Sequence, residues 1–134
     1  MTIVRDAFVE HTRSSRHLDL IGPSYERGGD VSVVGLVIDE RHTNARRMLH
    51  GGVLVAIADT VMGHTSERAA TGTRLVTVSL STAFVGAARL GEWVQGHATV
   101  RRSGRRLAFA SCAFHVDDRL ILTASGVFAT TSTN

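Results

Sequence analysis

The stretch that decides the fold of this chain is NARRMLHGGVLVAIAD at residues 44–59, which joins a polar segment to a long apolar run. From Val53 to Gly63 the only charged residue is Asp59. No proline interrupts the segment before Gly72, and glycine is a residue type that often ends a helix. A helix that is apolar nearly all round is a buried helix. The stretch therefore predicts a buried helix that begins at Gly51 and runs to about Ala69.

Asp59 is the residue in this helix that most needs an explanation. An ionised carboxylate on a buried helix costs on the order of several kcal/mol unless a partner or a function uses it. One interpretation is a catalytic carboxylate. The other is a carboxylate at the rim of the helix that is bonded to a neighbour, because structural pairs often resemble functional ones.

The segments around the helix predict an α+β fold. A β-branched run predicts a strand at 31–38, and four further strand candidates follow the helix at 75–85, 93–102, 107–116 and 120–130. Short turns separate these four, which indicates an antiparallel meander. Before the first strand we expect a short amphipathic helix at 4–11 and a short strand at 17–21, with a loop at 41–49 and a frayed tail at 130–134. One curved sheet wrapped over the helix would supply most of the cover that so apolar a helix needs.

The length and the cysteine count narrow the class of protein. A chain of 134 residues corresponds to one domain, 1–134. No apolar run is long enough to cross a membrane, the N-terminus lacks a signal peptide, and a single cysteine fits a reducing compartment, so we expect a cytoplasmic protein with no membrane partner. Cys112 falls in the apolar phase of an alternating strand, which favours a small core residue over a nucleophile.

The basic residues give no support to a nucleic-acid partner. All fifteen are arginine, yet the net charge is only +3, and aromatic residues make up 5% of the chain, too few for a stacking platform. The basic residues cluster at Arg46-Arg47 and at 101–106. A small anionic ligand explains the second cluster as well as a nucleic acid does.

The order of several motifs resembles one known family. Asn44, the run His50-Gly51-Gly52 and Asp59, followed by the strand segment 75–84, Gly91-Glu92 and the segment 100–105, are similar to hotdog-fold acyl-CoA thioesterases of the PaaI-like, phenylacetate-degradation type. The resemblance covers roughly residues 18–130. It implies a hotdog fold, in which a curved antiparallel sheet wraps around one long central helix, and hydrolysis of an acyl-CoA to a carboxylic acid and CoA without a cofactor. Two positions depart from the family pattern, Arg47 in place of a common glycine and Ala87 in place of a common proline.

Candidate catalytic residues follow from the helix start and from the resemblance. Gly51 and Gly52 would place free backbone N–H groups at the positive end of the helix dipole, with Gly51 as the main donor that polarises the thioester carbonyl; the alternative is that they only allow close packing. Asp59 is the candidate base or nucleophile. In the family a Ser or Thr near the attacking water occupies the position of Thr77, which could otherwise be an ordinary strand residue.

The resemblance also gives roles to Asn44 and His50. In the family the asparagine bonds the carboxylate or the water across a subunit interface, and the histidine supports the loop and the carbonyl. His50 could instead be only a polar loop donor. The spacing of His42, His50 and His64 matches no common zinc pattern, so we expect no metal site.

The turn at residues 102–105 is the candidate site for coenzyme A. The family often carries basic residues here near the CoA phosphates, and an arginine fork suits phosphate. Arg102, Gly104 and Arg105 are therefore expected to bind the substrate. The alternative is a solvated turn, the usual environment of arginine.

The spacing of Gly51 and Asp59 predicts the assembly. Eight residues along one helix separate them by roughly 12 Å, so both cannot reach one carbonyl carbon. Two antiparallel helices related by a twofold axis would bring Gly51 of one chain near Asp59 of the other, which gives a homodimer with shared active sites. Two such dimers are expected to join as a dimer of dimers, although the sequence does not decide between a dimer and a tetramer. Two other functions stay open, a noncatalytic acyl-CoA-binding protein and a hotdog hydratase or dehydratase, and the sequence does not identify the acyl group.

Overall fold

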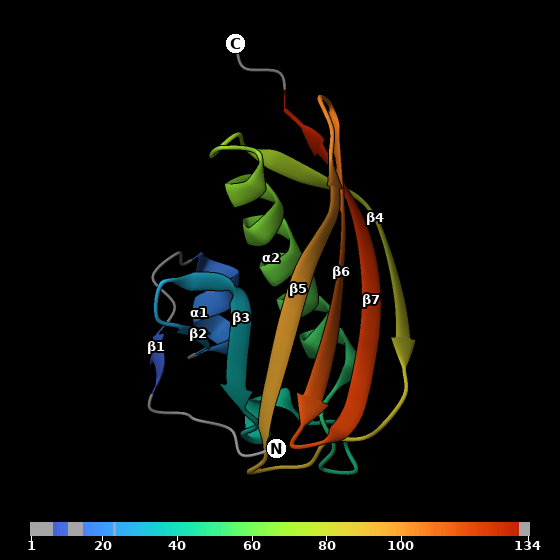
Figure 1. Cartoon of the computed structure of the whole chain (residues 1–134). Helices are drawn as coiled ribbons and strands as arrows, with labels where there is room; N and C mark the ends of the chain where they lie inside the picture. Colours follow the sequence, from blue (N-terminus) through green and yellow to red (C-terminus); the bar gives the residue numbers. More distant parts are fainter. Residues whose placement is uncertain (1–6, 11–14, 23, 132–134) are drawn as a thin grey trace.

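A computed structural model of the chain describes residues 7–10, 15–22 and 24–131. Figure 1 shows the helices and strands that these residues form, in their order along the chain. Their bounds are β1 Phe8–Glu10, α1 Arg16–Ile21, β2 Tyr25–Arg27, β3 Asp30–Val37, η2 Glu40–His42, α2 Gly51–Ala69, β4 Leu75–Phe84, β5 Trp93–Ser103, β6 Leu107–Val116 and β7 Arg119–Thr130.

The strands form one antiparallel sheet that curves around α2 (Figure 1). The strand order is β1-β2-β3-β5-β6-β7-β4. The helix begins at Gly51 and ends at Ala69, as expected, and its buried residues include Leu54, Ile57, Val61 and Met62. This arrangement of a curved antiparallel sheet around one long helix is the hotdog fold, so the predicted fold class is confirmed.

The predicted meander is correct for three strands and wrong for β4. Strands β5, β6 and β7 pair in succession, but β4 pairs with β7, and β5 pairs with β3. The connection at 85–92 therefore leads from the edge strand β4 past β7 and β6 to β5, inside the sheet. Strand spacing alone could not reveal this, because it indicates where strands lie along the chain and not which ones pair.

The N-terminal segments also differ from the prediction. Residues 16–21 form helix α1 instead of a strand, and the Ser15 side chain caps this helix by accepting a 3.2 Å hydrogen bond from the Leu18 N–H. Within the expected helix at 4–11, residues Phe8–Glu10 form strand β1, while residues 4–6 and 11 lie outside the described part. Strands β1 and β2 bring Phe8 and Tyr25 against Trp93, with ring centroids 5.1 and 5.9 Å away. These short segments take their structure from tertiary pairing, which overrides local propensity.

Strand β4 contains an irregularity that matters for the site. Thr77 pairs with Phe128 and Ser79 pairs with Val127, so Val78 is an extra residue in the ladder. A bulge of this kind shifts the alternation of side chains by one position. As a result Leu75 and Thr77 before the bulge and Leu80 after it all face α2.

The single cysteine behaves as expected of a core residue. Cys112 is buried on β6, 6% exposed, and burial raises the pKa of its thiol to about 12. A thiol with such a pKa is protonated at neutral pH and a poor nucleophile.

Candidate active site

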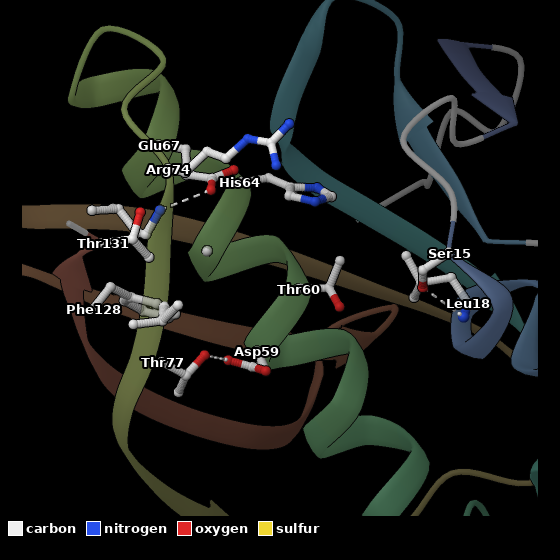
Figure 2. Close-up of a pocket in the computed structure, with 13 residues that line it drawn as sticks. Ser15, Leu18, Asp59, Thr60, His64, Glu67, Arg74, Thr77, Phe128 and Thr131 are labelled. Carbon is white, nitrogen blue, oxygen red and sulfur yellow. Dashed lines mark hydrogen bonds between the residues drawn. The ribbon is translucent and has the colours of Figure 1, made fainter. Parts of the chain in front are cut away.

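Asp59 and Thr77 meet across a groove between α2 and β4. The Thr77 hydroxyl donates a 2.7 Å hydrogen bond to Oδ1 of Asp59 (Figure 2). Asp59 is half-buried and lines a cavity of about 680 Å³. The carboxylate therefore has the polar neighbour that its place on an apolar helix requires, and it faces a space that a ligand can enter.

The start of α2 provides one free backbone donor. The Gly51 N–H donates none of the hydrogen bonds found among the described residues. The Gly52 N–H, by contrast, donates to Nδ1 of His50 at 2.9 Å. The expectation of two free N–H groups is therefore wrong for Gly52, because the His50 ring caps the helix there.

The capping bond also defines the His50 ring. Because Nδ1 accepts, a neutral His50 carries its proton on Nε2. The side chain is exposed, so this second nitrogen is open to a ligand. His50 thus accepts a hydrogen bond at the helix start and keeps its second ring nitrogen exposed beside Gly51.

Asn44 shapes the loop that precedes the helix. Its Oδ1 accepts hydrogen bonds from the backbone N–H groups of Arg46 at 2.9 Å and Met48 at 3.3 Å. Between them Arg47 has a φ of 60°, in the left-handed region that favours glycine. This explains physically why a glycine suits this position, and it places the long Arg47 side chain on the exposed surface of the loop.

Phe84, at the end of β4, is a site residue that the sequence reasoning missed. Its ring lies where a side chain on Gly51 would be, since a Cβ built there would stand 2.9 Å from the ring. Phe84 is nevertheless 56% exposed, unusual for a large aromatic residue. The available signal was a strand that ends in an aromatic residue, which alone does not distinguish a core residue from a site residue.

The two halves of the predicted site lie in different cavities. Asp59 and Thr77 line the groove described above, whereas Asn44, Gly51 and Phe84 line a second cavity of about 310 Å³. Within one chain the structure does not bring the carboxylate to the helix start. This agrees with the separation expected from the helix geometry.

The turn between β5 and β6 is exposed. The side chains of Arg102 and Arg105 form no hydrogen bond or ion pair with any other described residue. Neither residue lines the groove at Asp59 or the cavity at Gly51. The Gly104 N–H donates to the Leu107 carbonyl at 2.8 Å and so closes the turn. The phosphate role of this turn stays a prediction.

Comparison with known protein families identifies the family of this chain. Residues 47–123 match the model of the thioesterase superfamily, which is more than half of the chain. The chain belongs to the thioesterase superfamily. Its hotdog fold and PaaI-like resemblance agree with this membership.

Relatives of this thioesterase-superfamily chain come from bacteria and animals. The Pseudomonas aeruginosa protein PA0474, named as a candidate esterase, is 40% identical over 131 residues, 96% of this chain and 98% of its own length. Human acyl-coenzyme A thioesterase 13 is 35% identical over 77 residues, 55% of this chain and 53% of its own length. These relatives support thioester hydrolysis as the general activity.

Solved structures share the fold. Zebrafish thioesterase superfamily member 2 superimposes with a TM-score of 0.71 at 27% identity, over 74% of this chain and 73% of its own. The Bacillus halodurans protein BH2602, solved with CoA, superimposes with a TM-score of 0.69 at 24% identity, over 75% of this chain and 67% of its own.

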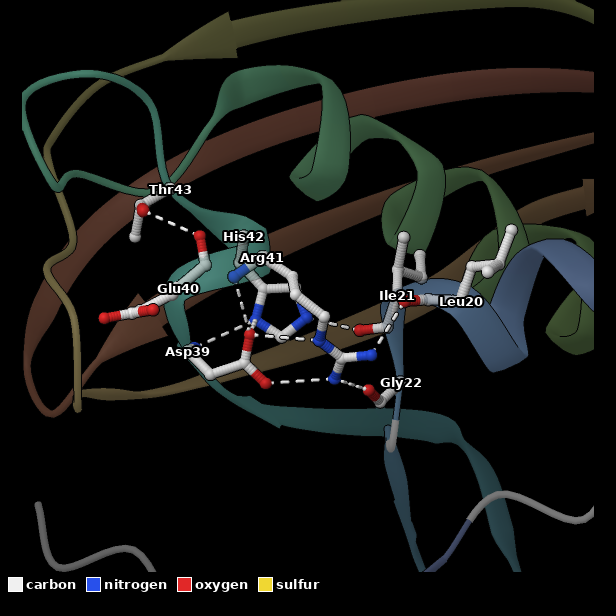
Figure 3. Close-up of polar contacts among 8 residues, drawn as sticks. All are labelled: Leu20, Ile21, Gly22, Asp39, Glu40, Arg41, His42 and Thr43. Atoms are coloured by element: carbon white, nitrogen blue, oxygen red, sulfur yellow. Dashed lines mark hydrogen bonds and ion pairs between the residues drawn. The ribbon is translucent and has the colours of Figure 1, made fainter.

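Helix α1 forms part of one wall of the groove. Its end is held by Arg41 and His42, which belong to the segment 41–49 that was predicted to be a loop. Leu18 of α1 lines the groove, and residues of η2 form hydrogen bonds with the end of α1 (Figure 3). The Arg41 guanidinium donates to the carbonyls of Leu20, at 2.9 Å, and Gly22, while the His42 ring contacts the Ile21 carbonyl. These contacts satisfy the open carbonyls at the helix end.

The described residues contain no group of three or more His, Cys, Asp or Glu side chains that could hold a metal ion. Among the helices of the described part, none is long and apolar enough to span a bilayer.

Proposed function

We propose that this chain is an acyl-CoA thioesterase that hydrolyses an acyl-CoA to a free carboxylic acid and CoA. The observation that carries the proposal is the Asp59–Thr77 pair in an open groove of a thioesterase-superfamily fold. Acyl-coenzyme A thioesterase 13 as a relative and the CoA bound to BH2602 support the CoA thioester as the substrate class.

The chemistry assigns the attack on the thioester to Asp59. Asp59 either takes a proton from a water molecule that then adds to the carbonyl carbon, or adds to that carbon itself. Thr77 holds the carboxylate through its 2.7 Å hydrogen bond. Collapse of the tetrahedral intermediate breaks the carbon–sulfur bond and releases CoA, whose sulfur takes up a proton. Where water has added, the other product is the free acid; where Asp59 itself has added, the acyl group stays on Asp59 as an anhydride, which a water molecule then hydrolyses to the free acid.

The start of α2 stabilises the developing oxyanion. The free Gly51 N–H lies at the positive end of the helix dipole and donates to the carbonyl oxygen. Asn44 and His50 stand beside it. The Asn44 Oδ1 is committed to the loop, so its amide nitrogen is the group that donates to the substrate.

A complete site then needs two chains. Strand β4 hydrogen-bonds to β7 on one side only, so its other edge has no strand partner among the described residues. Val76 and Val78 on this strand are 49% and 59% exposed, and such an apolar edge is a template for another strand. Pairing of two β4 strands about a twofold axis would place Gly51 and Asn44 of one protomer at Asp59 of its partner.

The test is a panel of short, long and aromatic acyl-CoAs incubated with the purified protein. Release of free CoA thiol is measured for the wild type and for Asp59→Ala as the background control. Hydrolysis by the wild type alone supports the proposal. Binding of acyl-CoA without turnover would favour a noncatalytic acyl-CoA-binding protein, and hydration of enoyl-CoA would favour a hydratase.

A further inference from the structure

The groove at Asp59 changes character along its length. Asp59 and Thr77 stand at one end, and His64, Glu67 and Arg74 stand at the other, with Phe128 between them (Figure 2). The apolar residues that line the groove are Leu18, Gly63, Leu75, Val76 and Phe128. Besides Thr77, the hydroxyl residues that line the groove are Ser15, Thr60 and Thr131. Thr60 donates to the Ala56 carbonyl at 2.9 Å, and Ser15 accepts from the Leu18 N–H.

The apolar lining suits a hydrocarbon chain better than the pantetheine arm. Pantetheine carries two amides, and an amide that loses water without a new hydrogen bond is destabilised. A methylene chain makes no such demand and gains from burial against Leu18, Leu75 and Phe128. With the thioester carbon at Asp59, the groove therefore fits the acyl side of the substrate.

The far end of the groove offers hydrogen-bond donors. The Arg74 side chain has no hydrogen-bond or ion-pair partner among the described residues, unlike the side chains of Arg41 and Arg119. Figure 2 shows it extending across the end of the groove toward the half-buried His64. A guanidinium with free donors binds oxygen acceptors, and a carboxylate best of all.

Backbone contacts hold Arg74 at this position. The Glu67 carboxylate accepts the Leu75 N–H at 3.0 Å, which ties the end of α2 to the start of β4. The Arg74 carbonyl accepts the Thr131 N–H at 3.3 Å. The Arg74 backbone is thus fixed by the fold, and its exposed side chain lines the groove from this fixed position.

We propose that the groove binds the acyl group and selects acyl groups whose far end carries a carboxylate or hydroxyl, bound by Arg74 and His64. The inference rests on the proposed acyl-CoA thioesterase function. Along α2 the distance from Asp59 to His64 is roughly 7 Å and to Glu67 roughly 12 Å. An extended chain advances roughly 1.2 Å per bond, so a six-carbon acyl group with its terminal oxygen reaches roughly 7 Å, the distance to His64, and roughly ten bonds are needed to reach Glu67.

The test compares three six-carbon substrates, hexanoyl-CoA, 6-hydroxyhexanoyl-CoA and adipoyl-CoA. The proteins are the wild type, Arg74→Met, which keeps an apolar stem, and Arg16→Met as a matched control, since Arg16 is exposed and does not line the groove. We expect the wild-type kcat/KM to favour an oxygen-ended chain over hexanoyl-CoA by roughly tenfold, the scale of one charge-assisted hydrogen bond. Arg74→Met should remove this preference and spare hexanoyl-CoA, whereas Arg16→Met should keep it.

Other outcomes would overturn the inference. Equal rates on all three substrates, or a preference for hexanoyl-CoA, would show that the groove does not select for oxygen. If Arg74→Met weakens all three equally and the loss disappears with pantetheine thioesters, Arg74 contacts the CoA phosphates instead. If the wild type hydrolyses other acyl-CoAs of the panel but none of these three, the inference fails and the proposed function stands. If it hydrolyses no acyl-CoA at all, the proposed function fails, and calorimetric Kd values for the same three substrates then decide the selection by themselves.

Discussion

The Thr77 hydroxyl donates a 2.7 Å hydrogen bond to the Asp59 carboxylate across the groove between β4 and α2. A bulge at Val78 allows it, because an unbroken strand with Thr77 facing the helix would turn Leu80 away from the core. A residue at the site and a residue of the core thus face the same side of one strand.

Replacing Asp59 should remove catalysis and leave the fold intact. We expect Asp59→Asn to lower kcat by roughly 10²-fold or more, the scale of lost general-base catalysis. Thr77→Val should lower kcat less, and Thr77→Ser, which keeps the hydroxyl, should stay near wild type. Steady-state kinetics with thermal unfolding of each variant checks this. Near-normal turnover of Asp59→Asn would contradict the catalytic role, and an unfolded variant would point to a structural one.

Phe84 should decide whether Gly51 can be replaced. Alanine is the better helix former, so Gly51→Ala would stabilise the helix if space allowed. The new Cβ would meet the Phe84 ring at 2.9 Å, and we expect a loss of about 1–3 kcal/mol in the free energy of unfolding together with a lower kcat. Adding Phe84→Leu should restore the stability, as measured by urea denaturation. An undiminished stability of the single variant would show that the ring moves aside freely.

The arginines of the β5–β6 turn should act on binding only. Arg102→Ala and Arg105→Ala are expected to raise KM for acyl-CoA substrates and to spare kcat, because a phosphate contact far from the thioester is uniform binding. Added salt should weaken the wild type in the same way. A pantetheine thioester that lacks the nucleotide is the control: if it loses as much as the CoA substrate, these arginines do not bind phosphate.

Mixing two inactive variants should restore activity if the site is shared. Asp59→Ala and Asn44→Ala chains, each nearly inactive alone, would form mixed dimers with one doubly defective site and one intact site. With random pairing half of the dimers are mixed, so activity should return to roughly a quarter of wild type. No recovery after demonstrated subunit exchange would place both residues in the same chain's site, or leave Asn44 without a catalytic part.

The contacts by which Arg41 and η2 hold the end of α1 should weaken in acid. Hydrogen bonds from Arg41 hold the pKa of the Asp39 carboxyl below its usual value, so the charged form stabilises the fold. A lowered folded pKa gives stability that is present above the unfolded pKa, about 3.9, and is lost as the pH falls through the folded pKa.

Asp39→Asn isolates this effect, since asparagine can still cap η2. The variant should unfold at lower urea concentration than the wild type at pH 7. The difference should shrink below about pH 4 and vanish once Asp39 is protonated in both states. A difference that persists unchanged in acid would mean that the carboxylate charge has no part in it.

The sequence alone predicted the parts of this protein that depend on local pattern. The apolar run after His50-Gly51-Gly52 predicted α2 and its start at Gly51. The β-branched run at 31–38 predicted β3, and the strand candidates separated by turns predicted the four later strands. The lone charge in the helix predicted that Asp59 would have a polar partner, and the helix rise predicted its separation from Gly51. These features need only the period of the hydrophobic pattern and the cost of a buried charge.

Only the tertiary structure decided the features that depend on contacts between distant segments. It paired β4 with β7, formed α1 where the pattern indicated a strand, and placed Phe84 over Gly51. In the folded chain the Gly52 N–H also donates to the His50 ring, and the Arg74 side chain lines the groove. Pattern along the chain cannot give these results, because strand pairing, capping partners and groove walls are set by which residues meet in space.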